Sequence, residues 1–423
     1  MRYDVGGTPC GLSPALITVS LFAPLRERNF RLLWLGETIS LAGDHFYFVA
    51  LPFLILELTG SDLAVGTVLM TAAFPRAILM LVGGAVTDRY TPRGVMLASN
   101  VCRGLLVALL ATLVVTEAVA VWHLYAVALA FGTADAFFFP AFTAIVPRVV
   151  GDTEKLAPAN GLLQTSANAT TLIGPAAGGV VVASLGTAAA LGFDVTTFAF
   201  SALMLWLIRL VPSAGAAGAE PGAERTRVGA AIREGLAYVW RDRGLRALIV
   251  AAALIGFASQ GPLVVGLTTL ADERFAGPTS FGAMISAAGA GAVAGSLGGG
   301  AIGARLNRRL ALVVVWSVTG LVIAGLGFAE SVAQAAVLAG VMGAGGAVVN
   351  VMLVTWLQSR TEPSLLGRVM SVVMFAAVGL TPLSYAVAGF VAEAHVTAMF
   401  VGSGTLVVVV AGAAAASGAL RQL

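Results

Sequence analysis

The sequence predicts an all-α membrane protein in which twelve transmembrane helices form two pseudo-symmetric bundles of six. This prediction depends on the composition, on the spacing of the apolar segments and on the positions of the basic residues. Charged residues make up 11% of the 423 residues and hydrophobic residues 58%, whereas a soluble domain carries roughly 25% charged residues. Together with a mean hydropathy of +0.94, this composition excludes soluble enzymes and nucleic-acid-binding proteins.

Twelve apolar segments are long enough to cross a bilayer, for which a helix needs about 20 residues. In chain order they cover approximately residues 31–57, 63–86, 94–116, 120–146, 161–184, 187–209, 246–270, 279–303, 310–329, 332–358, 365–391 and 396–417. The alternating pattern of transmembrane β-strands does not occur in them. Each segment is therefore predicted to be a membrane-spanning α-helix.

The basic residues are concentrated on one side of the predicted membrane. When the loops are sorted by side, 21 of the 24 lysines and arginines share the side of the two termini; Arg274 lies opposite, and Arg76 and Arg103 lie within spans. Because lysine and arginine are retained on the cytoplasmic side, both termini are predicted to be cytoplasmic and the membrane to be the cytoplasmic membrane. Residues 1–29 are interpreted as a cytoplasmic extension, since the apolar run 15–23 is too short to span.

The longest polar stretch separates the first six spans from the last six. It predicts an N-terminal bundle at 30–211, a cytoplasmic linker with an amphipathic helix at 212–245, and a C-terminal bundle at 246–423. Similar sequences in corresponding places favour duplication of one half: Gly83, Gly84, Ala85, Val86, Arg89 and Arg93 match Gly299, Gly300, Ala301, Ile302, Arg305 and Arg309. Paired six-helix halves are typical of secondary transporters that work by alternating access.

Three motifs give the chain a family resemblance. In chain order they are Gly84-Ala85-Val86-Thr87-Asp88-Arg89 closing with Arg93; Phe138-Phe139-Pro140-Ala141 followed by Pro147-Arg148 and Ala159-Asn160-Gly161; and Gly174-Pro175-Ala176-Ala177-Gly178-Gly179. With these motifs the sequence resembles the major facilitator superfamily, and within it the twelve-helix drug:proton antiporters that include macrolide and siderophore exporters. The resemblance runs from about Phe30 to Leu423, and it implies the major facilitator fold and proton-driven export.

The first motif is predicted to take part in conformational gating through Gly84, Asp88, Arg89 and Arg93. Asp88 has just left the membrane and can form an ion pair with either arginine or approach the start of the eleventh span, where free N–H groups favour an anion. Such a contact would join the two halves on the cytoplasmic side and favour an outward-facing state. The alternative is a solvated loop that only sets the topology.

The glycine-rich motif of the fifth span is the second gating candidate. Pro175 removes one backbone hydrogen bond, while Gly174, Gly178 and Gly179 permit close approach of another helix. The motif therefore predicts a tight and bendable contact between the halves. The alternative is that glycine is simply common in these helices.

Ionisable residues at membrane depth are functional candidates because they are costly there. Asp44, Arg76 and Asp135 each lie 13 residues, or about 20 Å of helix, from a basic residue at the cytoplasmic surface, so all three lie near the bilayer centre. We predict that Arg76 pairs with one aspartate and leaves the other to bind the coupling proton. Glu37, two turns before Asp44, extends a polar track towards the cytoplasm. A purely structural ion pair and a substrate contact alone are the alternatives.

A substrate cavity with aromatic walls and few charges would suit a bulky lipophilic solute. Its predicted lining residues are His45, Phe48, Phe131, Phe138, Gln260 and Asn350. For His45 the alternative is a packing role. Arg103 and Asp194 are interpreted as structural charges, and Asp194, nearer the outer end of its span, as interfacial.

The sequence favours a proton-coupled exporter of a lipophilic drug, antibiotic or secondary metabolite. An enzyme is not expected, because Lys155 follows no phosphate-binding glycine loop and the three histidines lack metal or triad spacing. The expected partners are a small lipophilic solute, protons and membrane lipids but no nucleic acid, with no cofactor, no metal and a monomeric state. The alternatives are a lipid, siderophore or nutrient transporter without proton antiport, and a transporter-like membrane sensor.

Overall fold

The computed structural model of the protein describes residues 22–210, 237–305, 308–361, 369–370, 372–373, 375–376 and 378–416. These residues are helical apart from short connections, and no strand occurs among them. Eleven helical segments within these ranges are long and apolar enough to cross a membrane. The prediction of an all-helical, multi-pass membrane protein is thereby confirmed.

The N-terminal bundle contains six of the membrane-spanning segments. Its helices are α1 (Arg28–Thr59), α2 (Asp62–Arg89), α3 (Pro92–Val115), α4 (Val121–Asp135), α5 (Phe138–Val150), α6 (Leu156–Leu185) and α7 (Thr187–Leu207), with 3-10 turns at Ala23–Arg26 and Thr153–Lys155. α4 and α5 together form one span. α1 ends at Gly60, which has a φ of 62°. Glycine adopts this left-handed conformation without steric cost, and the chain turns here into α2.

The C-terminal bundle has the same kind of helices. They are α9 (Arg243–Gly261), α10 (Leu267–Arg274), α11 (Pro278–Arg305), α12 (Arg308–Leu326), α13 (Val332–Arg360), α15 (Thr381–Ala394) and α16 (Val396–Ala416). A π-helical turn, η4 (Pro262–Gly266), joins α9 to α10 within one span, Arg243–Arg274. Pro262 lacks a backbone N–H, so the regular hydrogen-bond ladder is interrupted there.

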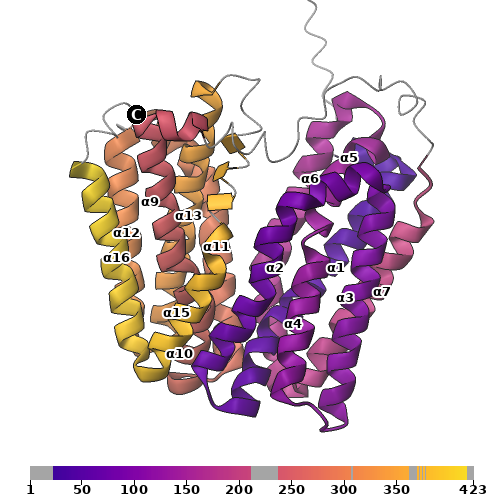
Figure 1. Ribbon diagram of the computed structural model, residues 1–423, viewed down its shortest axis with the longest axis horizontal. Coiled ribbons are helices and arrows are strands. Elements are labelled where there is room, and N and C mark those ends of the chain that lie inside the picture. The colour runs from indigo at the N-terminus through magenta and orange to yellow at the C-terminus, as the bar shows by residue number, and fades with distance from the viewer. Residues whose placement is uncertain are drawn as a thin grey trace, which may run out of the picture.

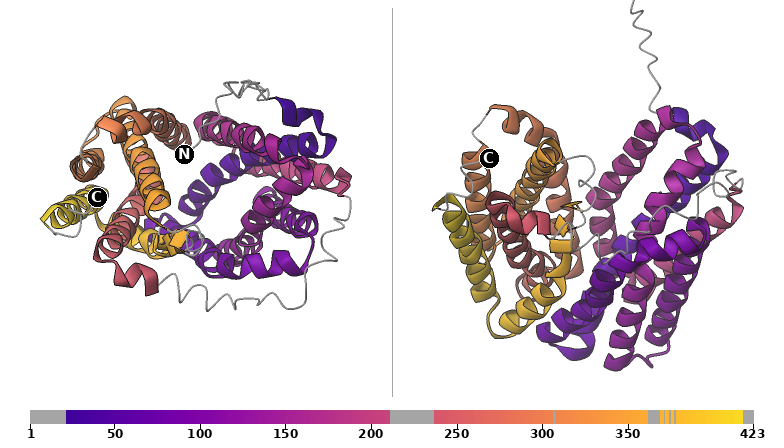
Figure 2. Two further views of the ribbon diagram at one scale, coloured as in Figure 1. Left: turned by 90° about the horizontal axis from the view of Figure 1, so that it is seen from above. Right: turned by 45° about the horizontal axis from the view of Figure 1, so that its top comes forward.

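The two bundles meet at the end of the molecule where α1 passes into α2, called the outer end from here on. Figure 1 shows α10 and α15 beside the start of α2 at this end, with the bundles diverging towards the opposite end. The view from above shows the two bundles side by side (Figure 2). α2 packs on α15 and α6 packs on α11. We call these two helix contacts the inter-half seam.

The seam combines close backbone approach with polar contacts. A Cβ placed on Gly66 of α2 would lie 2.4 Å from the Tyr385 carbonyl oxygen of α15, so this crossing requires glycine. Glu393 Oε2 accepts hydrogen bonds from the Ser61 hydroxyl and the Leu63 N–H, both at 2.9 Å. A carboxylate from one half thus caps the N-terminus of a helix in the other half.

Three predicted segments fall wholly or partly outside the described residues. The eleventh span, 365–391, is represented by α15 and by short helical stretches from residue 369 onwards. Residues 211–236 of the linker and its amphipathic helix lie outside, as do residues 1–21 of the N-terminal extension. The count of twelve spans therefore remains a prediction.

Candidate functional site

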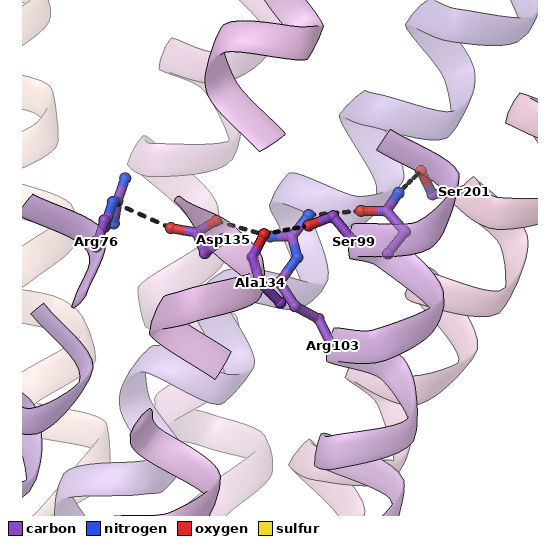
Figure 3. A network of polar contacts seen from close by, with 7 residues as sticks. Arg76, Ser99, Arg103, Ala134, Asp135 and Ser201 are labelled. Carbon is purple, nitrogen blue, oxygen red and sulfur yellow. Dashed lines mark hydrogen bonds and ion pairs between the residues drawn. The ribbon is translucent and has the colours of Figure 1, made fainter. Parts of the chain in front are cut away.

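Arg103 on α3 is the centre of a polar network inside the N-terminal bundle (Figure 3). Its Nη1 donates to Asp135 Oδ1 at 3.1 Å, and its Nη2 donates to Asn100 Oδ1 at 2.5 Å. Asn100 donates in turn to Ser201 Oγ on α7 at 2.8 Å. At the other end of the network, Arg76 of α2 lies 3.0 Å from Asp135 through its Nε and the aspartate Oδ2.

The network assigns a partner to Arg76. The sequence left both Asp44 and Asp135 open as that partner, and the structure places Asp135 in the ion pair. Arg103 joins the same carboxylate from the buried side, with only 3% of the residue exposed. Asp135 is thus held by two guanidinium groups.

Three aromatic rings surround the Arg103 guanidinium. The ring centroids of Phe131, Phe138 and Phe198 lie 5.8, 4.4 and 4.9 Å from its Cζ. A desolvated guanidinium is attracted to such ring faces. Phe138 is buried and does not line the cavity of the C-terminal bundle, so its assignment to a substrate cavity stays a prediction. Phe131, which also stacks on Tyr47 with 4.8 Å between ring centroids, packs around the same arginine.

Asp44 on α1 is left without an ion pair among the described residues. Its Oδ1 is buried and has no hydrogen-bond partner there, because both arginines of the network are bound to Asp135. Glu37, on the same helix, is buried as well. An ionised carboxylate in an apolar interior without a cation is strongly disfavoured, so Asp44 is a candidate for reversible protonation.

Asp194 on α7 corrects the sequence interpretation. It was placed near the outer interface, but it is fully buried against α1. A Cβ built on Gly43 would lie 2.5 Å from Asp194 Oδ1 and 2.0 Å from Thr197 Oγ1, so the missing side chain of Gly43 makes room for them. Asp194 therefore lies at the depth of Asp44, the residue next to Gly43.

The proline and the last glycine of the α6 motif lie on the seam with α11. A Cβ on Gly179 would be 2.4 Å from the Pro278 carbonyl oxygen, and one on Gly282 would be 2.2 Å from the Pro175 carbonyl oxygen. The Ala176 N–H donates across the seam to Ser286 Oγ at 3.0 Å. This part of the motif therefore lies in a tight contact between the halves.

The other two glycines of the motif face α1 of the same half. A Cβ on Gly174 would lie 2.6 Å from the His45 ring, and one on Gly178 would lie 3.3 Å from the His45 carbonyl oxygen. Their assignment to the contact between the halves was therefore wrong. His45 packs against α6, in agreement with the alternative interpretation of His45 as a packing residue.

The motif that follows α2 is only partly described. The side chain of Asp88 and the surroundings of Gly84 lie outside the described part, and Arg89 is exposed. Arg93 donates from Nε to the Leu205 carbonyl oxygen at 2.8 Å and from Nη2 to that of Trp206 at 2.5 Å, at the end of α7. Arg93 thus ties two helices of one half together, and the predicted link between the halves stays a prediction.

A cavity of about 260 Å³ lies inside the C-terminal bundle. Its walls come from α9, η4, α11, α12 and α13, and they include Ser259, Gln260, Trp316, Thr319 and Gly346. The lining carries no charged side chain. Gln260 lies there as a polar group in mainly apolar walls, which is typical of ligand sites.

The remaining two residues predicted to line a cavity lie elsewhere. Asn350 is exposed on α13 and is not part of the lining, so its prediction is not supported by this cavity. Phe48 stacks on Phe281 of the other half, with 5.9 Å between ring centroids. Among the described residues, no three His, Cys, Asp or Glu side chains gather in a group that could hold a metal.

Sequence reasoning missed three polar residues of this region. Asn100 and Ser201 extend the Arg103 network, and the Tyr47 hydroxyl is buried beside it without a partner among the described residues. One signal was present: Asn100 and Tyr47 each lie three residues from a charged residue on the same helix, a spacing that puts the two side chains on one face.

The chain is similar in sequence to a family of transporters and to proteins named as efflux pumps. The profile of the family described as "transmembrane secretion effector" matches residues 19–423. The multidrug efflux pump Tap of Mycolicibacterium fortuitum is 27% identical over 361 residues, which is 84% of this chain and 86% of Tap. The macrolide efflux protein A of Streptococcus pyogenes is 22% identical over 231 residues, 54% of this chain and 55% of that protein.

Among solved structures, the nucleoside transporter NupG has the same fold. It superposes with a TM-score of 0.73 at 13% sequence identity, covering 91% of this chain and 98% of NupG. At this identity the likeness concerns the fold alone.

Proposed function

This chain belongs to the transmembrane secretion effector family of the major facilitator superfamily, and from that premise we propose that it exports a lipophilic drug, antibiotic or secondary metabolite in exchange for protons. As a member of this superfamily it is a transporter and not an enzyme. Relatives named as multidrug and macrolide efflux pumps support the substrate class. We also propose twelve spans with both termini in the cytoplasm.

The observation that carries proton coupling is the environment of Asp44. Among the described residues, one buried oxygen of its carboxylate has no partner, while two arginines are bound to the neighbouring Asp135. Asp44 can therefore become neutral by taking up a proton without the loss of an ion pair among the described residues. A residue that changes charge inside the membrane can link proton movement to a change of conformation.

The seam supports alternating access. It joins the halves at the outer end, through α2 with α15 and α6 with α11, which in the proposed orientation is the outside of the cell. The described conformation is then inward-facing, with substrate entering from the cytoplasmic side. To release it outside, the contacts of Glu393 with Ser61 and Leu63 must open.

A resistance assay tests the function. The protein is expressed in a pump-deficient bacterial host and challenged with a panel of lipophilic antibiotics and dyes, with and without a protonophore. We expect resistance to at least one compound and its loss when the proton gradient is dissipated. Resistance that survives the protonophore would contradict proton coupling, and unchanged sensitivity to every compound would favour a lipid, siderophore or nutrient transporter or a sensor.

Filling the C-terminal cavity should weaken export of bulky compounds. A Cβ built on Gly346 meets no atom within 4 Å, so Gly346→Leu places its side chain in open cavity space. We expect a loss of transport affinity of about tenfold, equivalent to about 1.4 kcal/mol, measured as the concentration for half-maximal efflux of a compound from the panel. The matched control is Gly402→Leu on α16, where a Cβ also meets nothing within 4 Å. Equal efflux by both variants would show that this cavity takes no substrate.

A further inference from the structure

Three buried oxygen atoms between α1 and α7 lack hydrogen-bond partners among the described residues. They are Asp44 Oδ1, the Tyr47 hydroxyl and Asp194 Oδ2. Gly43 brings the two helices together here, since Asp194 Oδ1 occupies the space that a side chain at Gly43 would fill. Asp44 directly follows Gly43 on α1, and its carboxyl group and that of Asp194 repel each other when both are ionised. Two carboxyl groups on different helices thus share one buried site.

The charges around this site do not balance two ionised carboxylates. α1 contributes Glu37, Asp44 and Tyr47, and α3 contributes Arg103, while α6, the third helix packed on α7, has no titratable residue in Leu156–Leu185. On the other side of α1, Arg76 of α2 and Asp135 of α4 also act on Asp44, but they are already paired with each other. Arg103 already donates to Asp135 and is shared with it. Two like charges side by side in a low-dielectric site cannot both ionise.

The hydrogen-bonding capacity of the three atoms also indicates that the site holds a proton. Ionised carboxylates only accept hydrogen bonds, whereas the Tyr47 hydroxyl and the buried Arg103 Nε–H, which also lacks a partner among the described residues, supply one donor each. One added proton converts a carboxylate into a further donor on the α1–α7 contact itself. Thr197 Oγ1 lies 3.2 Å from Asp194 Oδ1 and 2.8 Å from the Asp194 carbonyl oxygen, so it holds the first carboxylate oxygen and leaves Oδ2 free.

We propose that Asp44 and Asp194 form a coupled acid pair that holds one proton between them, so that the coupling site spans α1 and α7. The assignment of this proton to transport rests on the proposed function, but the shared proton itself does not. The step is a proton transfer alone: an O–H bond forms on one carboxylate and breaks on the hydronium ion that delivers the proton, which leaves as water. Because the two acids lie on different helices, loading and unloading the pair changes the attraction between α1 and α7.

Infrared titration of the purified protein tests the pair without any substrate. Aspartate is labelled with 13C, and the protonated carboxyl signal is followed from mildly acidic to alkaline pH. A coupled pair releases its protons in two separated steps, so the wild-type protein should show a second step at high pH. Asp194→Asn and Asp44→Asn should each leave a single step at lower pH than the upper step of the wild-type protein, because the remaining acid no longer has a charged neighbour. Asp152→Asn, at an exposed aspartate, is the matched control and should leave both steps in place.

Several outcomes would overturn the pair. If one of the two variants keeps the upper step unchanged, the acids titrate independently. If sodium chloride, compared with potassium chloride, moves the steps in the wild-type protein, the site binds a metal cation in place of the shared proton. A coupled pair in a protein that fails the resistance assay would contradict the proposed export and leave the pair standing, so the two failures are distinguishable.

Discussion

Asp44→Asn should reduce gradient-driven export to the level of vesicles that lack the protein. Asparagine keeps the size of the side chain but can neither ionise nor release a proton, so it fixes the neutral state of a buried group that makes no ion pair among the described residues. Export is measured in everted membrane vesicles energised by a proton gradient, with a compound that the resistance panel identifies. Exchange of labelled for unlabelled compound at equal concentrations should persist, because it requires no net proton movement.

The control lies on the same helix. Glu57→Gln makes the same acid-to-amide change at an exposed position near the outer end of α1, and it should keep full export. Uphill export by Asp44→Asn at the wild-type rate would show that Asp44 does not carry the coupling proton. A variant that loses both export and exchange would show that Asp44 binds substrate or stabilises the fold.

The level of Arg76 and Asp135 along their helices could be predicted from the sequence because the rise per residue of an α-helix is constant. Thirteen residues from a cytoplasmic arginine placed Arg76 and Asp135 at one level, and the structure brings them to 3.0 Å. The direction in which a side chain points around its helix could not be predicted in this way. The contact of Arg103 with Asp135 was therefore not predicted, since Arg103 lies only ten residues from Arg93 in the sequence.

Asp194 shows why the prediction of the site from the sequence was incomplete. Its position near the outer end of its span suggested a residue at the membrane interface. Whether a side chain at that position is buried depends, however, on which neighbouring helix packs against α7 there. Gly43 allows α7 to approach α1 exactly where Asp194 and Thr197 project, and a glycine in a chain with 51 glycines gives no such signal alone. For the same reason, the sequence did not predict that the Phe138 ring packs against Arg103.

Arg103→Met should lower the free energy of unfolding by about 3–5 kcal/mol, the usual cost of removing one partner from a buried ion pair. Arg103 is 3% exposed, and its loss leaves Asn100 Oδ1 without its donor and Asp135 with Arg76 alone. Stability is measured by reversible unfolding of the detergent-solubilised protein in denaturant. Arg148→Met removes an exposed arginine at the end of α5 and should change the stability by less than about 0.5 kcal/mol.

A double variant separates the ion pair from simple packing. If the cost arises from an uncompensated carboxylate, Arg103→Met combined with Asp135→Leu should recover a large part of the lost stability, because no buried charge is then left without a partner. If Arg103 acts mainly by filling the space between the rings of Phe131, Phe138 and Phe198, the two substitutions should add. Additive losses would contradict the ion pair as the source of stability, and the Arg103 network would then be a packing feature and not an electrostatic support for the neighbouring Asp44.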